Sequence, residues 1–155
     1  MSVKFPPLLT SERVQYTDKI KSLKTAFDSL TELLAKGQSE VTPNEIFDAL
    51  VSREKLGSTC IGNGIAIPRA KINITTPRAA LLVLKKGLAI NSVDKKPVTF
   101  LLAILIPKKK NKSYSRMLRN INSQLTSKEI LNKLIIIKNP KRLADHFQEI
   151  LENNE

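Results

Sequence analysis

The chain has 155 residues, of which 41% are hydrophobic and 26% are charged, as expected for one globular domain with a sizeable core. No run approaches 18 consecutive apolar residues and the N-terminus does not resemble an export signal, so we expect a cytoplasmic protein without a membrane span. The single cysteine excludes an internal disulfide and a cysteine-rich zinc site. We expect neither a metal nor another cofactor.

The net charge of +12 is concentrated in the middle of the chain. Fifteen basic residues and only one acid, Asp94, lie between Lys55 and Lys128. A solvated lysine-rich surface explains this distribution, and so does a binding surface for an acidic protein, a nucleic acid or another polyanion. Phe100 and Tyr114 are the only aromatic residues in this span, which argues against stacking on single-stranded bases.

The first part of the chain predicts an extended segment and two helices. Residues 8–16 are expected to be extended, because apolar and polar residues alternate near their end. Residues 22–36 have apolar residues at helical spacing, and Gly37 follows where a helix would end. The segment Thr42-Pro43-Asn44-Glu45 is a capping box with proline at the first helical position, so it predicts the start of a second helix.

The rest of the chain alternates between strands and helices. A glycine-rich segment leads into a short strand at 65–67, and the near-continuous apolar runs at 79–84 and 98–106 are typical of strands buried on both faces. Gly87 and residues 94–97 are expected to form turns. The remaining pattern predicts a helix at 113–125, a short segment toward 137 and a last helix from Asn139-Pro140. This order indicates a single α/β domain.

Residues 53–70, REKLGSTCIGNGIAIPRA, form the most distinctive segment. It resembles the phospho-acceptor segment of the fructose/mannitol-type enzyme IIA proteins of the bacterial phosphotransferase system, and most of all their nitrogen-regulatory (PtsN-like) branch. In that family the pattern is REK-(L/M)-GSTGIGNGIAIPHA, and its histidine carries the phosphoryl group. The resemblance implies one enzyme IIA domain over residues 1–155, with a mixed sheet flanked by helices, and it places Arg69 at the histidine position.

Arginine cannot replace histidine in this chemistry. A phosphohistidine relay needs an imidazole nitrogen with a lone pair, whereas arginine stays protonated and has no acceptor lone pair. The resemblance also implies a second, supporting histidine, and counting from Pro107 that position falls on Tyr114. The only histidine, His146, is in the last helical segment, where we expect it to be structural or exposed. We therefore expect no competent catalytic residue.

The glycine-rich segment can instead provide backbone N–H groups and hydroxyls to an anion. The alternative is that its glycines only permit tight turns between helix and sheet. The predicted anion-binding or partner-binding residues are Arg69, Ser58, Thr59, Gly62, Asn63 and Gly64.

The favoured hypothesis is a degenerate, non-phosphorylatable regulatory protein that acts through protein–protein contacts and is not an enzyme. The resemblance implies regulatory partners such as potassium-transport or sensor-kinase components, while the basic surroundings of the site disfavour docking of the phosphocarrier protein. Two alternatives stay open. One is a polyanion-binding or nucleic-acid-binding protein on the same scaffold, and the other is residual phosphotransfer through Ser58 or Cys60.

Overall fold

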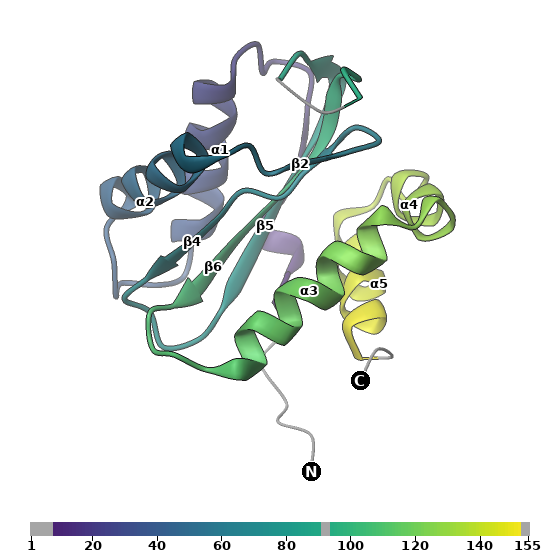
Figure 1. Cartoon of the computed structure of the whole chain (residues 1–155). Helices are drawn as coiled ribbons and strands as arrows, with labels where there is room; N and C mark the ends of the chain where they lie inside the picture. Colours follow the sequence, from purple (N-terminus) through teal and green to yellow (C-terminus); the bar gives the residue numbers. More distant parts are fainter. Residues whose placement is uncertain (1–7, 91–93, 153–155) are drawn as a thin grey trace.

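A mixed six-stranded sheet lies at the centre of the fold, with helices on both of its faces (Figure 1). The computed structural model describes residues 8–90 and 94–152. The strand order is β1-β5-β6-β3-β2, and β4 also pairs with β6. β5 and β6 are antiparallel, while β1 runs parallel to β5 and both β3 and β4 run parallel to β6. The strands are β1 (Val14–Thr17), β2 (Cys60–Gly62), β3 (Ile65–Ala66), β4 (Arg69–Ile72), β5 (Arg78–Leu88) and β6 (Val98–Pro107).

The helices divide into two groups that bury opposite faces of the sheet. In Figure 1, α1 (Leu23–Ala35) and α2 (Pro43–Leu56) lie on one side, and α3 (Lys112–Thr126), α4 (Lys128–Ile135) and α5 (Pro140–Glu152) lie on the other. Because side chains alternate along a strand, β5 and β6 contribute to both cores. Leu82 and Leu101 pack on the side of α1 and α2, whereas Leu81 and Leu102 pack on the side of α3 and α5.

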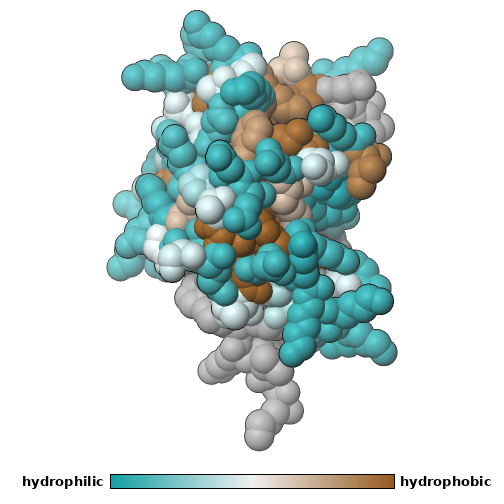
Figure 2. All heavy atoms as spheres, turned by 90° about the vertical axis from the view of Figure 1, so that its left-hand side faces the viewer, coloured by the Kyte–Doolittle hydropathy of each residue, from teal (hydrophilic) through white to brown (hydrophobic). Residues whose placement is uncertain are grey.

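The outer surface of the first helix pair is mainly polar. Figure 2 shows this side as largely hydrophilic, with separate hydrophobic areas between the polar side chains. Leu56, the last residue of α2, is 85% exposed. None of the described helices has the length and apolar composition needed to cross a membrane.

The helix starts confirm the capping predictions. The predicted cap at Asn139 is present, because its side-chain oxygen accepts the backbone N–H of Arg142 at 3.1 Å at the start of α5. Thr42 caps α2 in the same way by accepting from the N–H of Glu45 at 3.1 Å, and its hydroxyl donates to the Glu45 carboxylate at 3.2 Å. The apolar runs at 79–84 and 98–106 form β5 and β6 and are almost entirely buried, also as expected.

Other parts of the sequence-based assignment were incomplete or wrong. Gly87 is not a turn residue but lies inside β5, where a side-chain Cβ would come within 2.4 Å of Pro97 Cβ. The expected extended entry contains a short 3-10 helix, η1 (Ser11–Arg13). β2 and β4 were not predicted. β2 has three residues without an alternation of apolar and polar residues, and β4 does alternate from Arg69 to Ile72 but is only four residues long.

Candidate functional site

Residues 53–70 run from the last turn of α2 through β2 and β3 to the start of β4. Gly57 caps α2, and β2 and β3 then form an antiparallel pair separated by Asn63 and Gly64. β4 begins at Arg69 and pairs with β6 along Ile104 and the residues that follow it. The glycine-rich segment therefore lies directly before the strand that presents Arg69.

Glycine is required at only part of this segment. Gly62 has a φ of 90° and Gly64 a φ of 80°, which are left-handed conformations that favour glycine. Asn63 between them has a φ of 56°, which asparagine tolerates better than most residues. Gly57 differs, because its φ of 164° is ordinary extended backbone and a Cβ there would meet nothing within 4 Å. The turn at residues 62–64 thus needs its glycines, whereas the cap of α2 does not.

The Glu54 carboxylate already binds the groups of Thr59 that were expected to face an anion. Its oxygens accept the Thr59 backbone N–H at 2.9 Å and the Thr59 hydroxyl at 2.7 Å. Thr59 is only 6% exposed, so this pairing satisfies two polar groups inside the protein. Neither group of Thr59 is free for a ligand in this arrangement.

A second carboxylate, that of Asp94, binds the glycine turn from outside the segment. Asp94 Oδ2 accepts the backbone N–H of Asn63 at 2.8 Å, and Oδ1 accepts the N–H of Lys96 at 3.1 Å. A Cβ on Gly62 would come within 3.3 Å of Asp94 Oδ2, so glycine also permits this close approach. The single acid of the basic span therefore occupies the turn amide that we expected to contact an anion.

The Arg69 side chain is half-buried at the start of β4 and has no hydrogen-bond or ion-pair partner among the residues that the structure describes. Burial lowers its pKa, the nearby Arg53 guanidinium lowers it further, and Glu54 acts in the opposite direction. Arginine nevertheless stays protonated near neutral pH. The guanidinium is therefore a partly desolvated cation with unused donors.

Tyr114 lies near the start of α3, on the same side of the sheet as Arg69. Arg69 pairs in register with Ile104 of β6, and register partners on adjacent strands direct their side chains to the same face. Ile104 belongs to the core cluster against which the half-buried Tyr114 packs. α3 also contacts β2 of the glycine-rich segment. That Arg69 and Tyr114 form one anion site stays a prediction.

The remaining candidate nucleophiles are placed less favourably. Ser58 is exposed, and its hydroxyl accepts the backbone N–H of Cys60 at 3.2 Å. Burial is the main cause that raises the pKa of the Cys60 thiol, and the charges of Glu54 and Asp94 raise it further against the opposing hydrogen bond of Ser58. His146 lies on α5, with Nδ1 3.7 Å from a Glu149 carboxylate oxygen.

This arrangement places a cationic guanidinium, and no imidazole, at the start of β4. Arg69 lies close enough to Arg53 for their charges to repel, so a bound anion would relieve that repulsion. The carboxylates of Glu54 and Asp94 accept hydrogen bonds from the backbone amides of Thr59 and Asn63 and keep their negative charges, and that of Glu54 partly offsets the charge of Arg69. Among the described residues no carboxylate pairs directly with the Arg69 guanidinium, so its N–H donors remain available to an external acceptor.

Sequence reasoning missed the roles of Glu54 and Asp94. Glu54 lies inside the distinctive segment, five residues before Thr59, a spacing that also allows a purely exposed helix end. Asp94 stood out only as the single acid among fifteen bases. Nothing in the sequence connected Asp94 with Asn63, which is 31 residues away.

Sequence comparison matches this chain to one protein family and to named relatives. The family described as "Phosphoenolpyruvate-dependent sugar phosphotransferase system, EIIA 2" matches residues 7–150. The nitrogen regulatory protein of Klebsiella oxytoca is 35% identical to this chain over 137 residues, which cover 87% of this chain and 84% of that protein. The nitrogen regulatory protein homolog of Haemophilus influenzae is 31% identical over 157 aligned positions, covering 99% of this chain and 95% of that protein.

Comparison with solved structures gives the same fold. The nitrogen regulatory protein IIA-Ntr of Neisseria meningitidis superposes with a TM-score of 0.83 at 23% identity, covering 90% of this chain and 96% of that chain. The mannitol IIA protein of Escherichia coli superposes with a TM-score of 0.69 at 19% identity, covering 92% and 98%. The predicted class, a single α/β domain with a mixed sheet flanked by helices, is confirmed.

Proposed function

We propose that this chain, which belongs to the EIIA 2 family of the phosphoenolpyruvate-dependent sugar phosphotransferase system, is a regulatory protein that acts through contacts with other proteins and does not carry a phosphoryl group. Relatives that cover most of the chain are named nitrogen regulatory proteins, which supports a regulatory role. An enzyme IIA for mannitol has been solved in complex with a phosphorylated enzyme IIB, which supports protein contact as the mode of action on this scaffold.

The observation that carries the proposal is the placement of Arg69. It follows the Ile67-Pro68 step after the glycine-rich turn and begins β4, and we assign it to the position of the phospho-acceptor. Its guanidinium is cationic and offers no lone pair, so it cannot form the phosphoramidate bond that a neutral imidazole forms. His146, the only histidine in the sequence, is on a different element, α5.

Phosphotransfer through Cys60 or Ser58 is disfavoured on chemical grounds. A thiol with a raised pKa is a weaker source of thiolate at neutral pH, and thiolate is the nucleophilic form. Ser58 would need a base to activate its hydroxyl. The Glu54 carboxylate near this segment accepts hydrogen bonds from Thr59 instead.

The proposal is tested by mass spectrometry of the intact protein after incubation with phosphoenolpyruvate, enzyme I and the phosphocarrier protein. A histidine-containing enzyme IIA in the same reaction is the positive control. We expect no mass gain for this chain and little gain for Arg69→His alone, because Tyr114 stands where we place the supporting histidine. The double variant Arg69→His/Tyr114→His should accept more phosphate than either single variant. Addition of one phosphate to the unaltered chain would overturn the proposal.

A second candidate function, binding to a polyanion, is favoured by the lysines that follow β6. Lys108, Lys109 and Lys110 are all exposed, and α3 begins two residues later with Lys112. Clustered cations of this kind bind phosphate backbones with strong salt dependence. Titration of fluorescent duplex DNA at low and at physiological salt tests this function. A chain of net charge +12 binds DNA at low salt by charge alone, so only saturable binding that persists at physiological salt supports a dedicated polyanion site.

A further inference from the structure

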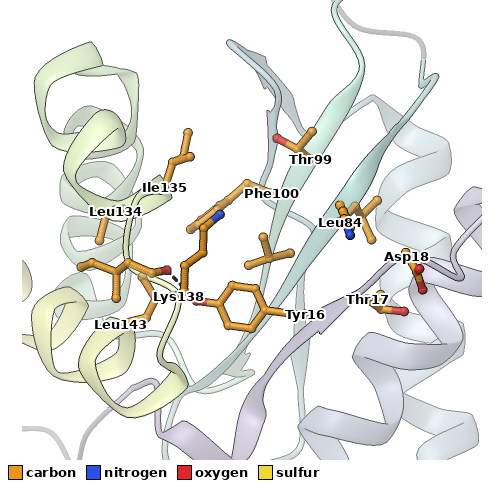
Figure 3. A pocket seen from close by; sticks show the side chains of 13 residues that line it. Tyr16, Thr17, Asp18, Leu84, Thr99, Phe100, Leu134, Ile135, Lys138 and Leu143 are labelled. Atoms are coloured by element: carbon orange, nitrogen blue, oxygen red, sulfur yellow. Dashed lines mark hydrogen bonds between the residues drawn. The ribbon is translucent and has the colours of Figure 1, made fainter.

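A pocket of about 610 Å³ opens between the sheet and the α4–α5 region, on the far side of β6 from β4 (Figure 3). Its lining comes from three neighbouring strands and from the two C-terminal helices with their connection. Neither the candidate site nor the proposed function uses any of these residues. The lining residues are Tyr16, Thr17, Asp18, Val83, Leu84, Lys85, Thr99, Phe100, Leu134, Ile135, Ile137, Lys138 and Leu143.

The floor of the pocket is a row of apolar side chains across β1, β5 and β6. Tyr16 pairs in register with Val83, and Val83 pairs with Phe100. All three belong to or pack against the core on the α3–α5 side, and Leu134 and Leu143 of that core form the facing wall. Tyr16 and Val83 are only partly buried, so this stretch of the sheet is not completely covered by its helices.

The hydroxyl of Tyr16, a polar group on this floor, already has a hydrogen-bond partner. The Tyr16 hydroxyl donates to the backbone carbonyl of Ile137 at 2.8 Å, which joins the sheet to the α4–α5 connection. Burial raises the pKa of Tyr16, so the hydroxyl keeps its proton. The interior of the pocket therefore offers mainly hydrophobic contact, and its polar selectivity has to come from the rim.

The rim has two lysines and one acid. Lys138 and Lys85 are exposed, and neither has a hydrogen-bond or ion-pair partner among residues 8–90 and 94–152. In Figure 3 the Lys138 side chain extends across the pocket near Phe100 and Tyr16, whereas Asp18 lies at the other end, beyond Thr17. The charge beside the apolar floor is therefore positive.

We propose that this pocket binds a small amphipathic anion, a carboxylate with an alkyl or aryl body, whose apolar part lies on the Tyr16–Val83–Phe100 row and whose carboxylate pairs with Lys138. The volume is in the range of small-molecule sites, which combine apolar walls with a few polar groups that orient the ligand. Lys138 supplies the orienting charge and Lys85 adds to the positive potential at the mouth. This proposal does not depend on the function proposed above, because the lining does not include Arg69 or Tyr114.

Octanoate is a suitable probe, because it combines a carboxylate with a short alkyl chain. Titration followed by amide chemical shifts should show saturable changes centred on Thr99, Phe100 and Ile137. Octyltrimethylammonium has a similar apolar body with the opposite charge and should bind at least about tenfold more weakly, while acetate should bind far more weakly because it has no apolar body. Equal binding of the ammonium compound, or no saturable binding of octanoate, would overturn the proposal.

Two variants locate the ligand. Lys138→Ala should weaken octanoate binding about fivefold, as expected for a partly exposed charge pair. Lys141→Ala is its control, because it removes an exposed lysine that does not line the pocket, and it should change the affinity little.

Val83→Trp should abolish octanoate binding by filling the pocket, with circular dichroism as the check on folding. If Val83→Trp does not fold, Lys138→Glu replaces it and should weaken binding more than Lys138→Ala. Equal affinity of the Lys138 variants and Lys141→Ala would overturn the assignment.

Discussion

The carboxylate of Glu54, in the last turn of α2, accepts both the backbone N–H and the hydroxyl of Thr59, at 2.9 and 2.7 Å. This contact joins the end of a helix to the segment that enters the sheet at β2. Ile67 then donates its backbone N–H to the Thr59 carbonyl at 3.0 Å, so Thr59 links α2 to the chain just before Arg69 as well. The position of Arg69 therefore depends on a buried threonine and one carboxylate.

Glu54→Ala should lower the free energy of unfolding by about 1–3 kcal/mol, because it leaves two buried polar groups of Thr59 without their partner. Urea denaturation measures this change. Glu32→Ala is the matched control, since Glu32 is an exposed helical glutamate, and it should change the free energy by less than about 0.5 kcal/mol. A loss no larger than that of the control would show that water replaces the carboxylate at Thr59.

Asp94→Ala should release the turn at residues 62–64. The substitution removes the acceptor of the Asn63 N–H and of the Lys96 N–H, so hydrogen exchange at both amides should become faster. Asp48→Ala, which removes an exposed acid from α2, should leave these rates unchanged. Slow exchange at Asn63 in the Asp94 variant would mean that the glycine conformation alone protects this amide.

The parts of the fold that were predicted are those fixed by local rules. Caps and apolar runs depend on neighbouring residues, so Thr42 at α2 and the buried strands β5 and β6 could be recognised in the sequence. β4 could not, because its alternation of polar and apolar residues covers only four positions and its strand conformation depends on pairing with β6. Pairing of this kind is a tertiary effect that no local pattern contains.

The candidate site was predictable in its composition but not in its contacts. The resemblance of residues 53–70 identified the segment and Arg69. It did not indicate that the amides of Thr59 and Asn63 already have carboxylate partners, since both pairings require the folded arrangement. The pocket under α4 and α5 was missed for a similar reason, because its floor combines residues from three strands that are far apart in sequence.

Gly87→Ala should destabilise the protein although residue 87 is exposed. The new Cβ would lie 2.4 Å from Pro97 Cβ, and the proline ring cannot rotate away, so the strands must shift at a cost of about 1–3 kcal/mol. Gly57→Ala is the control, because its φ of 164° suits any residue and a Cβ there meets no atom within 4 Å. Thermal unfolding followed by circular dichroism should show a lower midpoint for Gly87→Ala only.

The reactivity of Cys60 should show the effect of burial directly. Its raised pKa means that the folded protein keeps the thiol proton at a pH where the unfolded chain has lost it. Stability should therefore fall as the pH rises above the pKa of the unfolded thiol, until the folded thiol also ionises. Alkylation by iodoacetamide, followed as a function of pH, should have a higher midpoint in the native protein than in urea. Coincident midpoints would contradict the raised pKa.

Arg69→Ala should weaken the binding of phosphate or of an acidic partner peptide, if the guanidinium holds anions at this site. The reason is that Arg69 is half-buried and has no described partner, so its donors are available for charge-assisted hydrogen bonds. Lys71→Ala is the matched control, because it removes one exposed charge from the same strand. We expect a loss of several-fold for Arg69→Ala and a loss of less than about twofold for the control, measured by calorimetric titration at low salt. Asp94→Ala should have the opposite effect, since it removes a competing carboxylate and frees the Asn63 amide. Equal affinity of the unaltered protein and Arg69→Ala would show that the arginine does not bind the ligand.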